Sequence, residues 1–409
     1  MKKIELLAPA GDLERLKVAV IYGADAVYVG GQIFGLRSAA KNFSIEDLKE
    51  AVEFAHSRGV KVYVTANIIP HNEDLTDLPD YLVELGKVGI DALIISDPGT
   101  FSIVQEVLPD MEIHISTQAN NTNYRTINFW YKQGAKRVVL ARELSLNEIK
   151  EISEKIPEDL ELEGFIHGAM CMSYSGRCLL SNYMANRDAN RGECAQPCRW
   201  KYHIVEEKRP GEFMPVYEDE TGTYIMNSKD LCMIQHIPEV IEAGINSLKI
   251  EGRMKTTYYV ATTVRAYRMA IDEYLKDPKN WRSNPQWLEE LNKASHRDFT
   301  TGFYFQRPDE KEHIYSDQSY VRTYDFIGLV KEYDEKEKVA LIEQRNRFFK
   351  GDHIEVVGPR EEIYERVIEE MWDIDGNQID VAPHPQQLVK IKIDYPLKPF
   401  DLLRKIREE

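Results

Sequence analysis

The chain has 409 residues and a formal net charge of −16. The length exceeds that of a usual single domain, and the negative charge excludes a protein that binds nucleic acid through a broad positive field, although a local basic groove stays open. The start of the chain is charged, Glu5 and Asp12 interrupt the apolar stretch of a signal peptide, and no segment reaches the roughly 18 apolar residues of a membrane helix. We therefore expect a cytoplasmic protein without a membrane partner.

Eight apolar segments before residue 253 are predicted to be strands. Helical patterns separate them, such as "SIEDLKEAVEFAHSRG", in which Ser44 caps the helix and Asp47 completes a capping box. Apolar strands that alternate with helices predict parallel strands buried on both faces, and eight such units match a TIM-type (β/α)8 barrel. A doubly wound open sheet is the alternative, because closure is not visible in a sequence. The eight segments are "IELLAPA", "YGADAVYVG", "VKVYVTAN", "VGIDALIISD", "EIHISTQAN", "QGAKRVVLAR", "LEGFIHG" and "AGINSLKIEG".

Polar side chains follow nearly every predicted strand. The carboxyl ends of barrel strands open into one mouth, where the active sites of such barrels lie. Asp97 precedes Pro98 and is the member best explained as a helix cap. Glu163 lies at the start of its strand, and a structural role inside the barrel is at least as well supported. The expected mouth residues are Asn67, Gln118, Arg142, His167, Glu251 and Arg253, joined by Arg37 and Asn42 in "GLRSAAKNF" after the second strand.

The composition changes after residue 275. We expect the barrel at 1–275, with an insertion at 168–230 after its seventh strand. A polar, proline-bearing connector follows at 276–322. Short β-rich runs such as "KVALIEQRN", with a hairpin turn in "DIDGNQ", predict a small, mostly-β domain at 323–409.

Four of the five cysteines lie within 28 residues of the insertion, with the spacing Cys171-x6-Cys178-x15-Cys194-x3-Cys198. Four thiolates suit zinc or an iron–sulfur cluster. Zinc sites usually pair their cysteines in tight knuckles, and only the last pair does so here, so the spacing favours a four-iron (4Fe–4S) cluster and keeps zinc as the alternative. Cys232 lies in "SKDLCMIQHIPEVIEAG", where we expect it to open a helix and pack as a small apolar residue.

Long stretches of the chain resemble the collagenase-like peptidase family U32. The resemblance is carried by "EGFIHGAMCMSYSGRCLLS", "RDANRGECAQPCRW", "HISTQANNTN" and "SLKIEGRMKTTYYVA", and it continues into "EQRNRFFKGDHIEVVGP". Family members include a collagenase-type protease of unassigned mechanism, RNA hydroxylation proteins and oxygen-independent ubiquinone hydroxylases. The resemblance to the longer tRNA hydroxylation proteins implies formation of 5-hydroxyuridine at the tRNA wobble position, dependence on prephenate, and a 4Fe–4S cluster on the four clustered cysteines.

The residues allow these activities to be compared. A peptidase needs an activated nucleophile or a metal-bound water, and the sequence has no "HExxH" motif or nucleophile elbow. Hydroxylation of a base is an oxidation, and an iron–sulfur cluster is an electron carrier. We therefore favour tRNA hydroxylation, with a peptidase or a non-catalytic partner of a paralogous hydroxylase subunit as alternatives.

If the protein hydroxylates tRNA, the chemistry of the mouth side chains suggests a role for each of them. Arg142, Arg253 and His167 are expected to hold a dicarboxylate co-substrate such as prephenate, and Glu251 to act as a general base or to hold Arg253. In "EQRNRFFKG", Arg345, Arg347 and Lys350 surround two phenylalanines. These three are the candidate RNA contacts, with a buried hairpin edge as the alternative.

Overall fold

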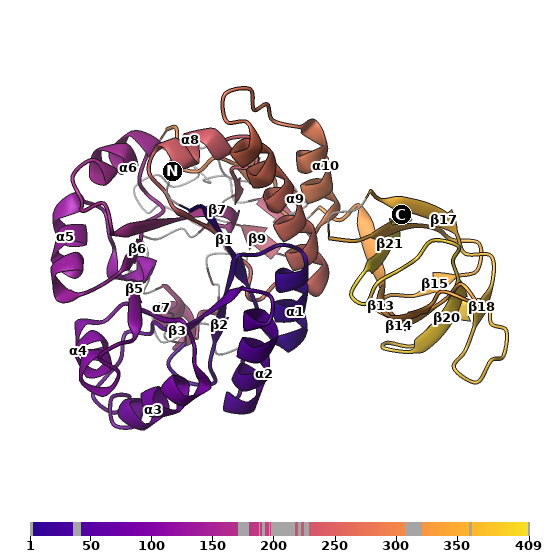
Figure 1. Cartoon of the computed structure of the whole chain (residues 1–409), viewed down its shortest axis with the longest axis horizontal. Coiled ribbons are helices and arrows are strands. Elements are labelled where there is room, and N and C mark those ends of the chain that lie inside the picture. The colour runs from indigo at the N-terminus through magenta and orange to yellow at the C-terminus, as the bar shows by residue number, and fades with distance from the viewer. Residues whose placement is uncertain are drawn as a thin grey trace, which may run out of the picture.

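Eight parallel strands close into a barrel at the centre of the first domain (Figure 1). The computed structural model describes residues 3–35, 42–170, 180–187, 189, 193–195, 197, 217–219, 222–224, 229–306, 321–359 and 362–407. The last barrel strand pairs with both the first and the seventh, so the ring is closed and the open-sheet alternative is wrong. The barrel strands are β1 (Glu5–Pro9), β2 (Ala26–Gly30), β3 (Lys61–Ala66), β4 (Ala92–Ile95), β5 (Glu112–Ile115), β6 (Arg137–Val139), β7 (Glu161–Ala169) and β11 (Ser247–Ile250).

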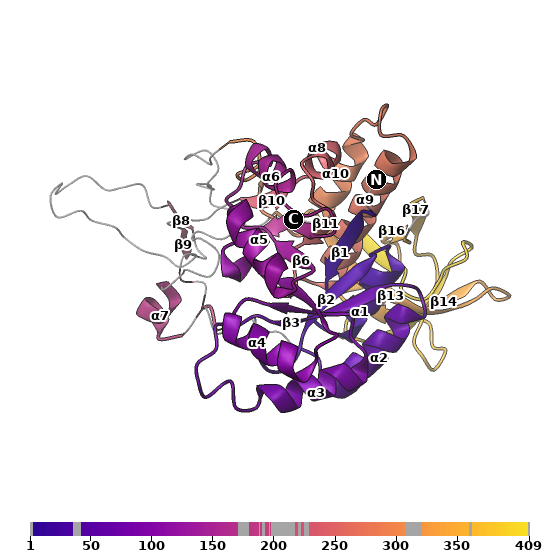
Figure 2. The same ribbon diagram turned by 60° about the vertical axis from the view of Figure 1, so that its left-hand side comes forward.

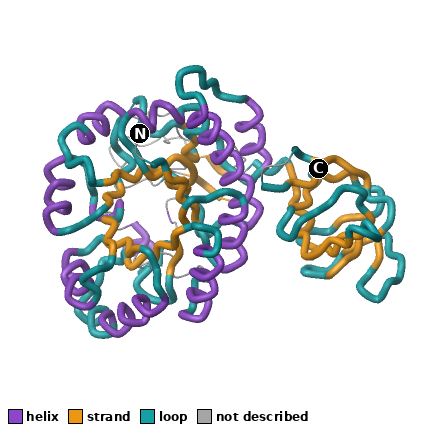
Figure 3. The backbone as a smooth tube through the Cα atoms, viewed as in Figure 1, coloured by secondary structure: helices purple, strands orange, loops and turns teal. Residues whose placement is uncertain are grey.

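Helices surround the ring of strands (Figure 3). The predicted capping box is present: the Ser44 side chain accepts from the Asp47 backbone, and the Asp47 side chain accepts from the Ser44 backbone. Asp97 caps the fourth helix by accepting from the backbone N–H of Thr100, which confirms its structural role. The outer helices are α1 (Leu13–Ile21), α2 (Ile45–His56), α3 (Leu78–Val88), α4 (Pro98–Val107), α5 (Tyr124–Gln133), α6 (Leu146–Ser153), α8 (Ile237–Glu242) and α9 (Thr257–Lys276).

The segment between β7 and β11 departs from the regular barrel. It contains α7 (Leu180–Ala185) and a short pair of strands, β8 (Tyr217–Asp219) and β9 (Gly222–Tyr224). It then returns along β7 as the antiparallel strand β10 (Asp230–Cys232). Cys232 therefore ends a strand, and the prediction that it opens a helix is wrong. The prediction that it packs as an apolar residue is confirmed, because the side chain is buried in the main core.

Two further elements follow α9 within the range 276–322. Helix α10 (Pro285–Lys293) packs beside α9, and β12 (Phe299–Thr300) pairs with β10. The segment predicted as a polar connector therefore contributes to the barrel domain, because Trp287 and Leu291 of α10 are buried in its core.

The C-terminal domain is mostly β and lies beside α9 and α10 (Figure 1). A seven-stranded sheet has the order β17-β16-β21-β13-β14-β20-β18, and β15 (Phe348–Phe349) pairs separately with β19 (Val381–Ala382). The sheet encloses its own apolar core. Its strands are β13 (Tyr324–Asp334), β14 (Val339–Gln344), β16 (His353–Val357), β17 (Tyr364–Val367), β18 (Met371–Trp372), β20 (Leu388–Lys392) and β21 (Leu402–Ile406).

Buried polar contacts join the two domains. The hydroxyl of Tyr22, the C-cap residue of α1, donates to the carbonyl of Val357 at 2.8 Å. Arg404 on β21 is fully buried and reaches Glu290 of α10 at 2.9 Å and Glu355 of β16 at 2.6 Å. These contacts fix the position of the C-terminal domain against the barrel. Among the described helices, none is long and apolar enough to cross a membrane.

Candidate active site at the barrel mouth

Three residues predicted from the strand ends converge around the hydroxyl of Tyr28 on β2. Burial raises the pKa of Tyr28, the carboxylate of Glu251 raises it further, and the guanidinium groups of Arg253 and Arg142 oppose the shift. The hydroxyl donates to the carbonyl of Ile250 at 2.9 Å, which ties β2 to the end of β11. One carboxylate and two guanidinium groups, from the segments that follow β11 and β6, therefore influence the same hydroxyl at the mouth.

Arg253 is held rigidly at this point. Its Nη1 donates to Oγ1 of Thr65 and its Nη2 donates to Oδ1 of Asn42, both at 2.9 Å. Asn42 has a φ of +51°, a left-handed conformation that asparagine adopts more readily than most residues. A side chain on Gly30 would overlap the guanidinium, so glycine is needed there for close approach. The predicted placement of Asn42 and Arg253 in one mouth is consistent with this geometry.

Amide side chains form a second part of the mouth. Nδ2 of Asn67, after β3, donates to Oγ of Ser116 at 3.3 Å, and the backbone N–H of Gln118 donates to the same oxygen. Among the described residues, Oε1 of Gln118 is buried and accepts no hydrogen bond. The structure therefore brings Asn67 and Gln118 together around Ser116.

The ring of His167 lies in a buried aromatic cluster at the end of β7, and its backbone carbonyl accepts from the N–H of Glu251 at 2.9 Å. Its Nδ1 is 3.3 Å from the hydroxyl of Tyr267, and its ring packs against Tyr259 and Phe299. Burial, with added repulsion from Lys255 and His296, lowers the pKa of His167 to about 3. The ring is neutral near pH 7, so it supplies no positive charge to a carboxylate. The expectation that His167 joins Arg142 and Arg253 in holding a carboxylate co-substrate stays a prediction, and the neutral ring would contribute to it a hydrogen bond rather than a charge.

A buried charged layer lies inside the barrel, below the mouth. Glu163 accepts from Nζ of Lys249 at 2.6 Å and lies 3.3 Å from Nη1 of Arg137, and Arg137 also reaches Glu5. Burial acts to raise the pKa of Glu163, but Lys249 and Arg137 outweigh it and hold this pKa below its usual value. Glu163 therefore has the structural role inside the barrel that the sequence allowed.

Two residues at the mouth, Tyr28 and Thr65, were missed by the strand-end rule. They lie within strands rather than after them, in "AVYVG" and "KVYVTA". The sequence did contain a sign of both residues, because each is a polar or aromatic residue inside an otherwise aliphatic strand. A side chain of this kind can face the barrel interior rather than the surrounding helices.

The cysteine-bearing segment begins and ends at the mouth. Ala169 at the end of β7 pairs with Asp230 at the start of β10, so the chain leaves and returns at one place. Helix α7 overlies the ring of strands in Figure 1 and stands off its end in Figure 2. Half-buried Cys194 lies beside this helix, because the N–H of Ala195 donates to Oγ of Ser181 at 2.9 Å. The predicted site residues outside the described residues are Arg37, Cys171, Cys178 and Cys198.

The three candidate RNA contacts have different surroundings. Arg345 bridges the domains, since its Nη2 lies 2.5 Å from a carboxylate oxygen of Glu14 on α1 and of Glu343 on β14. Arg347 and Lys350 are exposed on the C-terminal domain. The two phenylalanines differ as well: Phe348 is buried and Phe349 is 44% exposed.

A cleft of about 610 Å³ separates the barrel mouth from the C-terminal domain. We call it the interdomain cleft. Ala169, Glu251 and Lys255 line its barrel side, and Arg322, Tyr324 and Phe326 are among the residues on its other side. The cleft therefore reaches the end of β7, where the cysteine-bearing segment begins.

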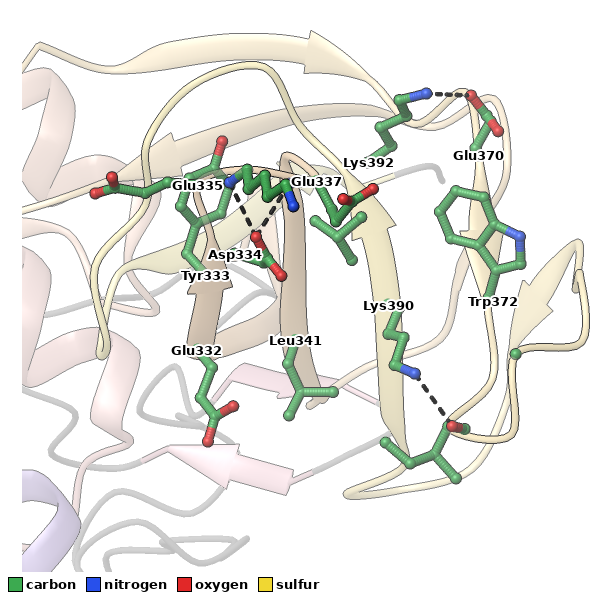
Figure 4. Close-up of a pocket in the computed structure, with 14 residues that line it drawn as sticks. Glu332, Tyr333, Asp334, Glu335, Glu337, Leu341, Glu370, Trp372, Lys390 and Lys392 are labelled. Atoms are coloured by element: carbon green, nitrogen blue, oxygen red, sulfur yellow. Dashed lines mark hydrogen bonds and ion pairs between the residues drawn. The ribbon is translucent and has the colours of Figure 1, made fainter.

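A second hollow, of about 1160 Å³, lies on the C-terminal domain alone (Figure 4). Lys392 extends toward Glu370 and Lys390 toward the carbonyl of Ile374, while Leu341 and Trp372 form its apolar part. Five acidic and three basic side chains line it, so it is a poor site for an anion.

Known proteins share this organisation along the whole chain. Residues 11–314 match the model of peptidase family U32, and residues 322–404 match the model of the peptidase family U32 C-terminal domain. The chain is 49% identical over 404 residues to tRNA hydroxylation protein P1 of Bacillus subtilis (strain 168), covering 99% of this chain and 95% of that protein. It is 37% identical over 312 residues to tRNA hydroxylation protein P2 of the same organism, covering 75% and 99%.

A relative that is named as a protease is also similar to nearly the whole chain. The chain is 34% identical over 419 residues to a protein named collagenase from Porphyromonas gingivalis, covering 99% of both chains. The family model spans most of the sequence and these relatives are aligned over nearly the full barrel, so the chain belongs to peptidase family U32.

Proposed function

We propose that this protein hydroxylates tRNA, converting wobble uridine to 5-hydroxyuridine with prephenate as co-substrate. The observation that carries the proposal is a barrel mouth at which Arg253 is held by Thr65 and Asn42, both at 2.9 Å, and at which the cysteine segment also begins and ends. The names of the two Bacillus subtilis relatives support tRNA as the substrate class.

The donor set of the cysteine segment fits an iron–sulfur cluster better than an open hydrolytic metal site. Four thiolates complete the coordination of a four-iron cluster. On zinc, four thiolates would occupy every coordination position and leave none for a hydrolytic water. Cys194 lies beside α7, in the segment that leaves the barrel at β7 and returns at β10, so the four cysteines belong to a segment anchored at the mouth. When bound, the cluster supplies one-electron transfer, which suits the oxidation of a uracil carbon. Its proposed ligands are Cys171, Cys178, Cys194 and Cys198.

The mouth side chains have distinct proposed roles. Arg253 and Arg142 bind the carboxylates of the co-substrate, because guanidinium groups form paired hydrogen bonds to carboxylates. Glu251 accepts a proton at the mouth. Asn67 and Gln118 offer donors and acceptors that match the polar edge of a uracil ring. Neutral His167 acts indirectly by holding Tyr267 and the end of β7 in place.

Peptide hydrolysis is a second candidate because a collagenase is similar over the whole chain. A histidine base needs a nucleophile within hydrogen-bond distance and a pKa near neutrality. In the described part of the chain, His167 instead contacts tyrosine and phenylalanine rings and has a pKa of about 3. His167 therefore lacks the properties of a hydrolytic base, and we favour hydroxylation over peptide hydrolysis as the function of the protein.

A third possibility is a partner role beside a catalytic paralogue. Bacillus subtilis has both a P1 and a P2 relative, which is compatible with paired subunits. Affinity purification of the tagged chain distinguishes the cases, because an obligatory paralogue would copurify in a fixed ratio.

Mass spectrometry of tRNA nucleosides from a strain lacking the gene tests the proposal. Loss of 5-hydroxyuridine, restored by the wild-type gene but not by a Cys194→Ala variant, is expected. Normal 5-hydroxyuridine in the deletion strain, with every paralogue also deleted, contradicts the assignment. Cleavage of denatured collagen by cluster-free protein, abolished by one mouth substitution, would support the peptidase instead.

A further inference from the structure

The interdomain cleft differs in charge from the rest of the protein. Its walls carry four basic side chains and two acidic ones, Glu251 and Asp325, whereas the whole chain has a net charge of −16. A local positive groove on an acidic protein concentrates a polyanion at one place and repels it elsewhere. The four basic residues are Arg15, Lys255, Arg322 and Arg345.

Two of these four already hold carboxylates. Arg15 pairs with Asp12 at 2.6 Å, and Arg345 bridges the two domains through Glu14. Nζ of Lys255 lies 4.0 Å from a carboxylate oxygen of Asp230 and over the ring of Tyr259. Arg322 is exposed just before β13. Lys255 lines the barrel wall of the cleft and Arg322 the opposite wall, so a phosphate bound in the cleft lies between two cations.

Aromatic rings lie between these cations. Phe326 stacks on Tyr258 across the domain boundary, with ring centroids 5.7 Å apart and planes 9° from parallel. Both Phe326 and Tyr324 are half-buried and line the cleft. Aromatic faces beside cations are the combination with which proteins bind single-stranded nucleic acid, because bases stack on the rings and phosphates contact the cations.

The width of the cleft is fixed by the buried contacts between the domains. Arg404, Glu290 and Glu355 join β21, α10 and β16, and Tyr22 bonds two carbonyls of the C-terminal domain. A groove formed in advance binds a flexible strand without the free-energy cost of first ordering the protein.

We propose that the interdomain cleft holds the single-stranded RNA backbone next to the target nucleotide and leads the strand into the barrel mouth. This inference rests on the proposed function and adds the path of the substrate. The cleft ends at Glu251 and Ala169, so a strand bound between Lys255 and Arg322 places a neighbouring base at the mouth. An acidic protein segment would match the cations but would leave the stacked rings without a function.

Salt-dependent binding of a labelled anticodon stem-loop RNA to the full chain tests this path. Each lost phosphate contact on a single strand should reduce the slope of log K against log salt concentration by about 0.7. We expect this reduction for Lys255→Gln and for Arg322→Gln. Phe326→Leu should weaken binding about tenfold with an unchanged slope, because stacking on an aromatic ring contributes about 1–3 kcal/mol per base.

Matched controls lie away from the cleft. Arg58→Gln, at an exposed residue just after α2, and Lys392→Gln at the second hollow should leave affinity and slope unchanged. Wild-type affinity and slope in both cleft variants would overturn the inference, and so would equal competition by polyglutamate. The proposed function would still stand if 5-hydroxyuridine disappears in the deletion strain, and it would fail separately if that nucleoside persists there.

Discussion

Arg253 and Asn42 meet at the barrel mouth through a 2.9 Å hydrogen bond, although 211 positions separate them in the sequence. One follows the last barrel strand and the other follows the loop after the second. Because β1 separates these strands in the ring, the guanidinium spans the top of one strand to reach its partners. The contact shows that the strand ends of this barrel form one connected group of side chains.

Replacing Arg253 by lysine should separate charge from geometry. Lysine keeps the positive charge but lacks the planar fork that bonds Asn42 and Thr65 together. We expect 5-hydroxyuridine to fall at least tenfold in a complemented deletion strain, with a loss of stability of about 1–2 kcal/mol. Arg58→Lys, at an exposed residue just after α2, is the control. Full modification by the Arg253→Lys variant, with normal circular dichroism, would mean that Arg253 only packs.

The mouth could be predicted from the sequence because a parallel barrel directs every carboxyl strand end to one side. This rule placed Asn42, Arg142, Glu251 and Arg253 without any knowledge of contacts. It could not show that the ring of His167 is buried among aromatic side chains, since position along a strand does not reveal which neighbours surround a side chain. The aromatic cluster around His167 comes from α9 and β12, which are distant in the sequence.

The cysteines should differ in their effect on metal content. Burial raises the pKa of the Cys232 thiol to about 11, so it stays protonated and is a poor ligand. Cys194 is half-buried beside α7. Anaerobically purified Cys232→Ala protein should keep its iron and acid-labile sulfide, whereas the Cys194→Ala variant should lose most of both. One zinc per wild-type chain, with no sulfide, would contradict the cluster.

His167 should make stability depend on pH in the acidic range. Its pKa is about 3 in the folded chain, against an ordinary value of 6.5. Between these values the unfolded chain binds a proton that the folded chain does not, so the free energy of unfolding falls as pH falls, by about 1.4 kcal/mol per unit. From pH 7 to pH 5 the loss from this group should be about 2 kcal/mol.

Urea unfolding of wild type and of a His167→Gln variant at both pH values measures that contribution. The variant should lose about 2 kcal/mol less on acidification. His114 and His296, whose pKa values are also lowered by burial, are present in both proteins, so the difference isolates His167. Equal losses would show that the ring reaches solvent or a proton acceptor in solution.

The charged layer inside the barrel was only partly predictable. Glu163, Arg137 and Lys249 lie in short apolar strands, where a single charged residue is compatible with the interior or with the outer face. Their pairing depends on the stagger of β6, β7 and β11, in which Glu163 is the register partner of both Val139 and Ser247. A single sequence does not reveal this register.

Breaking the network at Arg404 should destabilise the junction of the two domains. Arg404 is fully buried and bonds Glu355 through two nitrogens, at 2.8 and 2.6 Å. Removing one partner of a buried ion pair costs about 3–5 kcal/mol, because the remaining charge is left without its counterion. We expect the lower part of this range for Arg404→Met, since Lys293 stays within 3.1 Å of Glu355. Urea midpoints, monitored by circular dichroism, measure the loss.

The same type of substitution at an exposed ion pair shows how much of the loss of stability is due to burial. Lys392→Met removes a partner of Glu370 at the surface of the same domain, where such a pair contributes at most about 1 kcal/mol. Adding Glu355→Gln to Arg404→Met removes the uncompensated carboxylate and should restore part of the lost stability. If Arg404→Met costs no more than Lys392→Met, the buried network does not hold the domains together. The interdomain cleft would then be free to open, and RNA binding would include the free-energy cost of closing it.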